Sequence, residues 1–391
     1  VRRAYVFRLR PTARQHVVLA ACAESHRELY NAALQERRDA WAHKTRISYG
    51  DQSAQLTEMR SVRPDQAVWS FSSQQATLRR LDKAFAGFFR RVKRGQKAGY
   101  PRFKATARFD SVEWPKDGDG ARWLPERRRV YLKGVGEVKV NLHRQVEGQV
   151  KTIQIKRQGR HWLLVLSCDD VPTRPLPATG RQAGVDVGIV SFATMSDGER
   201  VANPRWGRVA GRGLASAQQR LARANRGSNN RERKRETVAA RHRKISNQRK
   251  DFHHKQARAL VERYDLLVVE DLQIVNMVRR AKPVPDPDNP GQYLANGARA
   301  KTGLSRSFSD AGWGRFVSIL RAKAEEAGRI WIEVDPRHTS DRCEHCGHAD
   351  SRNRVTQAVF ECQRCSHRAH ADEHAARNLL RAGLALHAQA A

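Results

Sequence analysis

The stretch CEHCGHADSRNRVTQAVFECQRCSHRAHADEHAARN, residues 343–378, determines how the rest of this sequence is interpreted. It contains two Cys-x-x-Cys pairs, and six residues separate the last cysteine from an acidic pair, Asp372 and Glu373. Paired cysteines are typical of a metal-binding module. A carboxylate placed so soon after them raises the question of whether the module also serves a catalytic site built from other parts of the chain.

The cysteine spacing, Cys-x2-Cys-x15-Cys-x2-Cys, predicts one tetrahedral metal site closed by four thiolates. Zinc fits best because a closed four-sulfur site needs no redox chemistry, although an iron–sulfur cluster can use the same ligands. No secretion signal is recognised, so metal ligands are favoured over disulfides. We expect a structural zinc ribbon over residues 340–367, with the ligands Cys343, Cys346, Cys362 and Cys365.

The charge of the chain points to a polyanionic partner. Its 391 residues carry 74 Lys plus Arg against 40 Asp plus Glu, a formal net charge of +34. Such an excess repels itself unless a polyanion neutralises it, which favours nucleic acid as the partner. A compositional bias toward Arg would explain the choice of Arg over Lys, but not the shortage of acids.

Membrane association is not expected. No run of 18 apolar residues exists, which excludes a membrane-spanning helix. The first residues, VRRAYVFRLRPTARQ, alternate apolar and basic side chains and have no apolar signal region. We therefore predict a cytoplasmic protein that associates with the nucleoid when it binds DNA.

The first half of the chain reads as a β unit interrupted by helices. Alternation and three-to-four periodicity predict, in order, a strand, two amphipathic helices and a set of short strands, at residues 5–11, 12–41, 73–92 and 127–169. The isolated Cys22 and Cys168 are interpreted as small buried residues. Three prolines in residues 171–180 mark a linker and the clearest domain boundary.

The second half of the sequence predicts an α/β unit. Strands end near residue 186 and span 190–195 and 264–272, a flexible loop covers 282–303, and a helix covers 307–328. Residues 208–258 carry 16 Arg plus Lys against 3 acids on helix-like sequence.

Three acids at element ends form a candidate catalytic set. Asp186 ends the strand in GVDVG, Glu270 ends LLVVE, and Asp372 begins the last helix. Each alone would be an ordinary surface or capping residue. Their order (first strand, fourth strand, late helix) matches an RNase H-like nuclease. The neighbouring acids Asp271 and Glu373 are alternatives, since adjacent residues point to opposite faces and the pattern does not choose between them.

Three converging carboxylates predict a divalent metal site. Two Mg²⁺ ions about 3.5–4 Å apart can activate a water and stabilise a leaving oxygen in phosphodiester hydrolysis. Hard oxygen ligands and open water positions suit Mg²⁺.

The stretch from VDPRHTSDRCEHC to HADEHAARNLL resembles the C-terminal signature of the TnpB family, the RNA-guided nucleases of insertion sequences related to compact type V CRISPR effectors. GYPRFK, GVDVGIVSFAT, VVEDL, NMVRRAK and SDAGWGRF resemble other parts of the same family in the same order. The resemblance therefore covers nearly the whole chain.

This resemblance implies a multidomain α+β architecture and assigns its parts. It implies a β-barrel wedge domain interrupted by a helical recognition domain, then an RNase H-like (RuvC) nuclease domain with the zinc ribbon inserted before the last helix. The corresponding residues are 1–11 and 96–170, 12–95, 181–339 with 368–391, and 340–367, with 171–180 as linker. The family's catalytic acids fall on Asp186, Glu270 and Asp372. One departure is His374, where the family commonly has an Asn near the metals.

The implied function is an RNA-guided DNA endonuclease. A guide RNA would pair with one strand of a double-stranded DNA target, and residues 1–170 would read a short flanking motif. Six aromatic residues in that region are candidates for stacking on bases, at least half of which we expect in the core: Tyr5, Phe7, Trp69, Phe71, Tyr100 and Phe103. Alternatives are a guide-directed repressor without cleavage, a transposase, and an RNA-free zinc-ribbon DNA-binding protein. The oligomeric state is left open.

Overall fold

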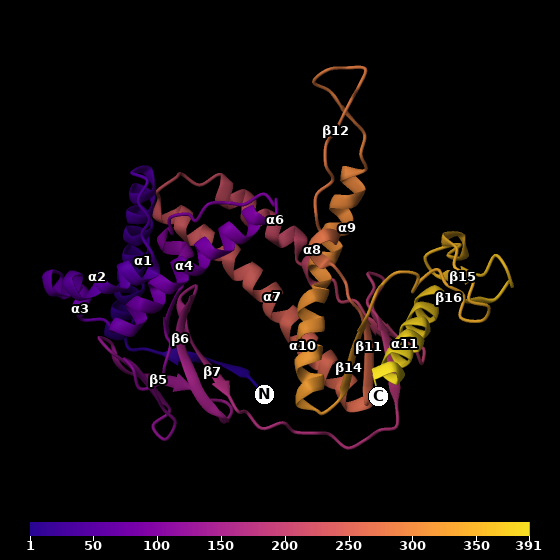
Figure 1. Ribbon diagram of the computed structural model, residues 1–391, viewed down its shortest axis with the longest axis horizontal. Coiled ribbons are helices and arrows are strands. Elements are labelled where there is room, and N and C mark those ends of the chain that lie inside the picture. Colours follow the sequence, from indigo (N-terminus) through magenta and orange to yellow (C-terminus); the bar gives the residue numbers. More distant parts are fainter. Residues whose placement is uncertain (391) are drawn as a thin grey trace. The chain divides into compact units, whose positions relative to one another are not determined.

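The computed structural model describes residues 1–390, which fold into two compact units (Figure 1). The first covers Val1–Pro172 and the second begins at Thr173, so the junction lies within the Pro-rich segment 171–180. No helix in the described residues is both long and apolar enough to cross a membrane.

The first unit is built on a seven-stranded antiparallel sheet with the strand order β2-β6-β7-β1-β5-β4-β3. The first strand of the chain pairs with β7 on one side and β5 on the other, so it lies in the middle of the sheet. No ladder joins β2 to β3 within the described part of the chain, which leaves the expected barrel open at that edge. The strands are β1 Arg3–Arg10, β2 Ser111–Trp114, β3 Ala121–Leu124, β4 Arg129–Leu132, β5 Gly136–Asn141, β6 Gln149–Gln158 and β7 His161–Asp169.

A helical insertion follows β1. Its members are α1 Ala13–Ala42, α2 Tyr49–Val62, α3 Pro64–Ala67 and α4 Phe71–Lys93. Thr12 begins α1 with a capping box, in which its side chain accepts from the Gln15 amide while Gln15 binds the Thr12 amide. The sequence pattern missed α2, a helix in which only Gln52 and Leu56 are buried. Its buried Gln52 binds the Ala33 carbonyl and the Arg37 guanidinium.

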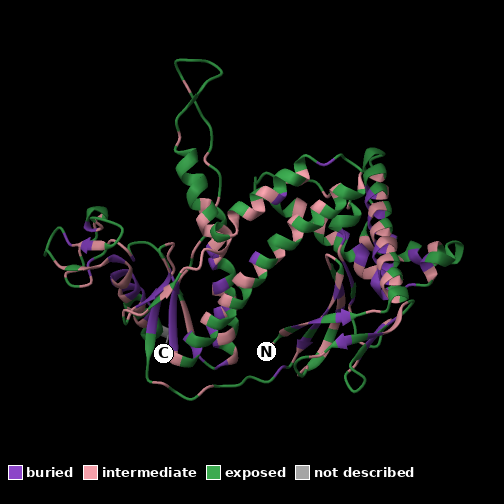
Figure 2. Cartoon of the chain, turned by 180° about the vertical axis from the view of Figure 1, so that it is seen from behind, coloured by how far each residue is buried: buried purple, intermediate pink, exposed green. Residues whose placement is uncertain are grey.

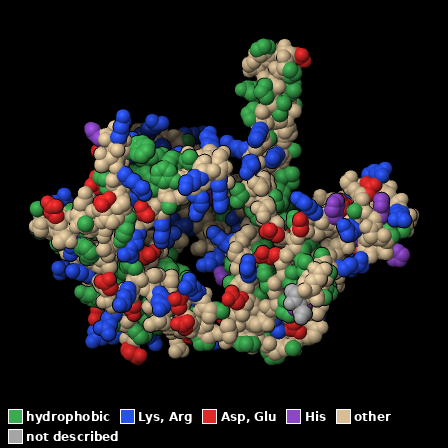
Figure 3. Space-filling model, in the orientation of Figure 1, with side chains coloured by type: hydrophobic (Ala, Val, Ile, Leu, Met, Phe, Trp, Pro, Cys, Tyr) green, Lys and Arg blue, Asp and Glu red, His purple; other side chains and the backbone are tan. Residues whose placement is uncertain are grey.

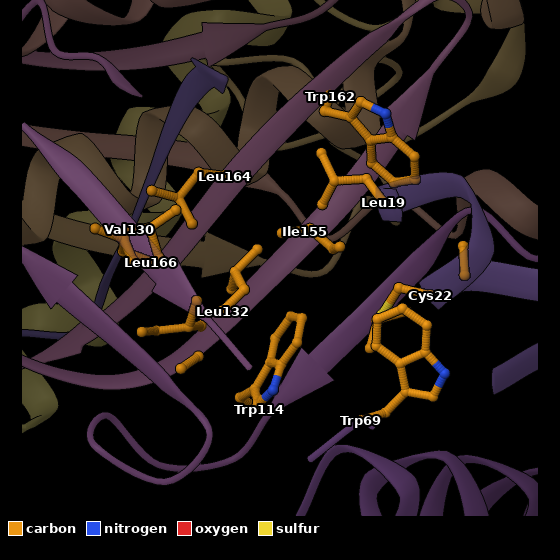
Figure 4. Close-up of a cluster of buried hydrophobic side chains, with 14 of the residues drawn as sticks. Leu19, Cys22, Trp69, Trp114, Val130, Leu132, Ile155, Trp162, Leu164 and Leu166 are labelled. Atoms are coloured by element: carbon orange, nitrogen blue, oxygen red, sulfur yellow. The ribbon is translucent and has the colours of Figure 1, made fainter. Parts of the chain in front are cut away.

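Sheet and helices of this unit share one core. Leu19 and Cys22 of α1 lie near Trp114, Ile155 and Trp162 of the strands (Figure 4). Cys22 and Cys168 are both buried, as expected. Of the six stacking candidates, three belong to this core (Tyr5, Phe7 and Trp69) and three are exposed (Phe71, Tyr100 and Phe103).

The second unit is built on a mixed five-stranded sheet with the order β10-β9-β8-β11-β14. Its strands are β8 Gln182–Asp186, β9 Ser191–Met195, β10 Arg200–Ala202, β11 Leu266–Glu270 and β14 Ile330–Val334. β11 runs parallel to both β8 and β14, whereas β9 and β10 are antiparallel. The carboxyl ends of β8 and β11 therefore lie side by side.

Helices cover both faces of this sheet (Figure 2). One face packs against α7 and α10, through Leu260, Phe316 and Leu320 among others, and the other packs against Leu379 of α11. The helices are α5 Trp206–Val209, α6 Gly211–Ala222, α7 Asn229–Arg263, α8 Ile274–Met277, α9 Ala298–Ala311, α10 Trp313–Glu326 and α11 Ala371–Ala390.

Two expectations for residues 282–328 were wrong in part. The predicted single helix over 307–328 is two helices, because Gly312 adopts a left-handed φ of 70° and ends α9 before α10 begins. The predicted flexible loop is shorter than expected, since α9 already begins at Ala298. The rest of that segment contains a small hairpin of β12 Val284–Pro285 and β13 Tyr293–Leu294.

Candidate functional site

The four cysteines form a cluster that fits a tetrahedral ion. Their sulfur atoms all lie within 4.8 Å of one another. Cys343 and Cys365 are 3.7 Å apart and Cys346 and Cys362 are 3.5 Å apart, sulfur to sulfur. Four sulfurs at about 2.3 Å from a central zinc are separated by about 3.8 Å, so the donor set matches zinc in chemistry and in size.

The two Cys-x-x-Cys turns, which we call knuckles, repeat the same backbone pattern. The Cys343 amide donates to the His348 carbonyl, and the Cys362 amide donates to the His367 carbonyl in the equivalent position. The residue after each second cysteine is left-handed, Gly347 with φ 75° and Ser366 with φ 56°. Ser366 therefore adopts a conformation that glycine adopts at lower cost.

Strand parity places two of the candidate acids on the same face of the sheet. Side chains alternate along β11, so that Leu267 and Val269 pack toward α7 and α10 while Leu266 and Val268 pack toward α11. Glu270 follows the parity of Val268 and falls on the α11 face.

The same reasoning applies to β8. Ala183 and Val185 belong to the α7 and α10 core, whereas Gly184 meets α11, so Asp186 falls on the α11 face too. Val269 pairs with Val185 in parallel register, which brings the following residues, Glu270 and Asp186, next to each other.

The third acid arrives because α11 lies unusually close to the sheet. A Cβ atom added to Gly184 would be 2.0 Å from the Ala376 carbonyl oxygen and 2.7 Å from the Leu380 amide. One added to Gly383 would be 2.4 Å from a Val268 methyl group. Two glycines, one on each partner, thus allow α11 to pack against β8 and β11, with Asp372 in its first turn.

The three acids act on one another electrostatically. Burial raises the pKa of Asp186 to about 7, and the negative charges of Glu270 and Asp372 add to this effect. Burial likewise raises the pKa of Glu270, while a hydrogen bond donated by the Thr339 hydroxyl over 2.6 Å opposes the rise. Within the described residues these carboxylates do not form a group with all ligand atoms inside 4.8 Å, unlike the cysteines. Mutual repulsion of this kind favours a cation between them.

Sequence reasoning missed Arg354, which is the cation beside these acids in the structure. Arg354 lies between the two knuckles and donates to Oδ1 of Asp372 over 3.0 Å. Its charge also lowers the pKa of both Asp186 and Glu270. This loop contains two arginines, and Arg352 pairs instead with Asp350, so position in the sequence alone does not identify Arg354. Thr339 was also missed, because its position in the sequence does not reveal its hydrogen bond to Glu270.

The alternative acids are placed differently. Asp271 is exposed, and by strand parity it points away from the α11 face. Glu373 forms ion pairs with Arg200 and Arg377. The geometry thus favours Glu270 and Asp372 over their neighbours.

His374 faces the ribbon, contrary to the expectation that this position lies near the metals. The ring is fully buried and stacks on Phe360 with centroids 3.6 Å apart. Its Nε2 accepts a hydrogen bond from the Glu344 amide, inside the first knuckle. The Glu344 carboxylate in turn binds the Arg377 guanidinium at 2.8 and 2.9 Å. His374 therefore joins α11 to the first knuckle.

Comparison with known proteins identifies the family. Three family models match: "Probable transposase" over residues 163–281, "Cas12f1-like, TNB domain" over 313–379, and "Helix-turn-helix domain" over 1–46. The last of these segments folds here as a strand followed by one long helix, β1 and α1.

Two curated relatives match almost the whole chain. "Putative RNA-guided DNA endonuclease InsQ" of Escherichia coli (strain K12) is 31% identical over 98% of this chain and 92% of its own length. "Putative RNA-guided DNA endonuclease" of Streptomyces pristinaespiralis is 32% identical over 98% of this chain and 90% of its own length. The chain belongs to the TnpB family, which is related to compact type V effectors.

A solved structure shares the fold. The Cas12f1 chain in a cryo-EM structure with sgRNA and target DNA superimposes with a TM-score of 0.56, over 93% of this chain and 82% of that one. Sequence identity is 14%, so this likeness concerns the fold.

Proposed function

We propose that this chain is an RNA-guided DNA endonuclease that hydrolyses phosphodiester bonds at a single RuvC-like site. The observation that supports the proposal is that Asp186 and Glu270 end neighbouring parallel strands on the face covered by α11, while Asp372 lies in the first turn of α11 and its charge raises the pKa of Asp186. The sheet of the second unit has the order β10-β9-β8-β11-β14, which is 3-2-1-4-5 when its strands are numbered in chain order. This order supports an RNase H-like interpretation. The formal charge of +34 suits a guide RNA and a DNA target.

Three carboxylates are the proposed magnesium ligands, and four thiolates the proposed zinc ligands. Bound Mg²⁺ supplies a Lewis acid for the scissile phosphate and lowers the pKa of an attacking water. The residues of the chain prepare that site. Thr339 orients Glu270 through its hydroxyl, and Arg354 offsets the repulsion that holds the acids apart. The guanidinium also suits the charge that develops on the phosphate.

The remaining assignments follow the family. The first unit would bind the guide and read a short motif flanking the target, and the basic helices α6 and α7 would line the guide–target channel. The ribbon would act through structure, because its thiolate cluster leaves no open position for substrate.

The test compares substitutions of Asp186 and of Asp271. Asp186→Ala is expected to abolish Mg²⁺-dependent cleavage of a guide-matched DNA while guided binding persists. The matched control is Asp271→Ala, an exposed acid beside Glu270, which is expected to cut normally. Undiminished cleavage by Asp186→Ala would refute the site. Guided binding by the wild type without any cleavage would instead favour a guide-directed repressor.

A further inference from the structure

A half-exposed aromatic cluster lies at the end of α4 and on the segment after it. Phe89 of α4 packs against both Phe85 and Phe88, and Tyr100 packs edge-on against the same two rings at 5.4 Å between centroids. Phe89 is 50% exposed and Tyr100 is 40% exposed. We call Phe88, Phe89 and Tyr100 the aromatic platform.

The platform is held in place by the first helix. The Asn31 side chain accepts from the Lys104 amide and donates to the Lys104 carbonyl, and Arg27 donates to the same carbonyl. The Arg38 guanidinium lies 5.2 Å from the ring centre of Phe103. The segment that carries Tyr100 is therefore anchored before any ligand arrives, which reduces the entropy lost on binding.

Positive charge surrounds the platform without acidic counterparts. Residues 83–104 contain eight Lys or Arg and no Asp or Glu. Seven of these basic side chains are exposed and, within the described residues, none of the seven forms an ion pair: Lys83, Arg90, Arg91, Lys93, Arg94, Lys97 and Arg102. On the face seen in Figure 3, hydrophobic surface and basic side chains lie side by side over the helical part of this unit.

We infer that the aromatic platform binds an unpaired segment of RNA by stacking its bases. Aromatic faces interleaved with cations are the means by which proteins hold single-stranded nucleic acid, whereas a paired duplex has no free base faces. RNA is favoured over a DNA strand because the platform is preformed and apolar. Such a surface needs a partner in the resting protein, before any DNA has been unwound.

This inference rests on the proposed function and specifies where the RNA is held. The aromatic platform is distinct from the three stacking candidates that lie in the core. Tyr5, Phe7 and Trp69 are 7% exposed or less and offer no face to a base.

The test uses the purified full-length chain and short RNAs labelled with 2-aminopurine, whose fluorescence is quenched on stacking. Phe89→Ala and Tyr100→Ala are each expected to weaken binding of single-stranded RNA about tenfold and to reduce the quenching. Binding of duplex RNA should change little. Phe89→Trp should restore both signals, whereas Phe89→Leu, which keeps apolar volume alone, should not. The matched control is Trp41→Ala, which removes a 72% exposed aromatic of α1.

The possible outcomes separate this inference from the proposed function. Wild-type affinity in both alanine variants, with unchanged unfolding temperatures, would overturn the platform while leaving the nuclease intact. Equal losses for single-stranded and duplex RNA would also overturn it, since simple charge binding would then suffice. A larger loss for single-stranded DNA than for RNA would refute RNA as the occupant. A wild-type chain that binds no RNA would defeat the proposed function itself.

Discussion

Arg354, from the loop between the two knuckles, donates to Oδ1 of Asp372 over 3.0 Å. A side chain of the ribbon thus reaches the acid that opens α11. Together with the hydrogen bond between His374 and the Glu344 amide, this contact ties the ribbon to the acidic site on two sides of the same helix turn. The segment that carries the cysteine cluster therefore also contributes contacts to the acidic site.

Replacing Arg354 is expected to change the pH dependence of cleavage. Its charge lowers the pKa of Asp186 and Glu270, so Arg354→Gln should raise both pKa values and move the acidic limb of the pH–rate profile upward by about one unit. Arg354→Lys keeps the charge and should stay nearer to the wild type. Arg352→Gln serves as control, because Arg352 pairs with Asp350. A superimposable profile for Arg354→Gln would contradict this role.

Asp186 is expected to destabilise the folded chain at high pH. Burial, with the charges of Glu270 and Asp372, raises its pKa from 3.8 to about 7, so the folded state binds a proton that the unfolded chain releases. The free energy of unfolding therefore falls as pH rises from about 4 to 7. In Mg²⁺-free buffer at pH 8, Asp186→Asn should be more stable than the wild type by roughly 1–4 kcal/mol. Denaturant titrations should show the gap closing toward pH 4; a constant gap would refute the shifted pKa.

Gly184 is expected to tolerate no side chain. A methyl group there would be 2.0 Å from the Ala376 carbonyl, a backbone atom that cannot move without α11. Gly184→Ala should lower the unfolding free energy by about 2 kcal/mol or more and reduce cleavage by displacing Asp372. Gly303→Ala is the matched control, since that glycine lies in α9 with open space around it and should stabilise by about 0.5–1 kcal/mol. Thermal unfolding and cleavage of both variants decide the matter.

Removing one thiolate should release zinc and loosen the ribbon. Cys362→Ser breaks a site whose binding energy is on the order of 10 kcal/mol. The small core of Cys343, Phe360, Cys362 and Ala371 is separate from the main cores of the unit, so we expect proteolysis within residues 340–367 before global unfolding. Cys168→Ala should keep its zinc. Full zinc content in Cys362→Ser would contradict the ribbon assignment.

His374 offers a test of how the ribbon and α11 are joined. His374→Asn keeps a hydrogen-bond acceptor but loses the ring stacked on Phe360, and His374→Ala loses both. Asn should retain more cleavage than Ala, and both should retain Mg²⁺ affinity because the ring contacts the ribbon. A Mg²⁺ affinity that falls with either variant would place His374 at the acids after all.

The strands and the cysteine cluster of the second unit could be predicted because their signals are local. The spacing of Cys343 and Cys346 is enough to indicate a knuckle. A short apolar run such as Leu266–Glu270 is typical of a buried strand. Gly312, by contrast, sits in the middle of a helical pattern, and its left-handed conformation depends on how α10 packs.

Contacts that depend on packing could not be predicted from the sequence. Glu270 is favoured over Asp271 because α11 covers the face of β11 to which Glu270 belongs. The sequence of β11 does not reveal which of its faces α11 covers. Arg354 is one of two arginines in its loop, and its contact with Asp372 forms only when the ribbon folds against α11. The direction of His374 likewise depends on the position of Phe360, fourteen residues earlier in the chain.

The close packing of α11 on Gly184 also has a bearing on protein synthesis. A nascent chain released before α11 would contain Asp186 and Glu270 but lack the third acid, and the glycine of β8 would have no helix against it. Incomplete products that stop before α11 would therefore lack one of the three proposed catalytic acids. Assembly of the proposed site depends on translation of α11, which follows every strand of the sheet in the chain.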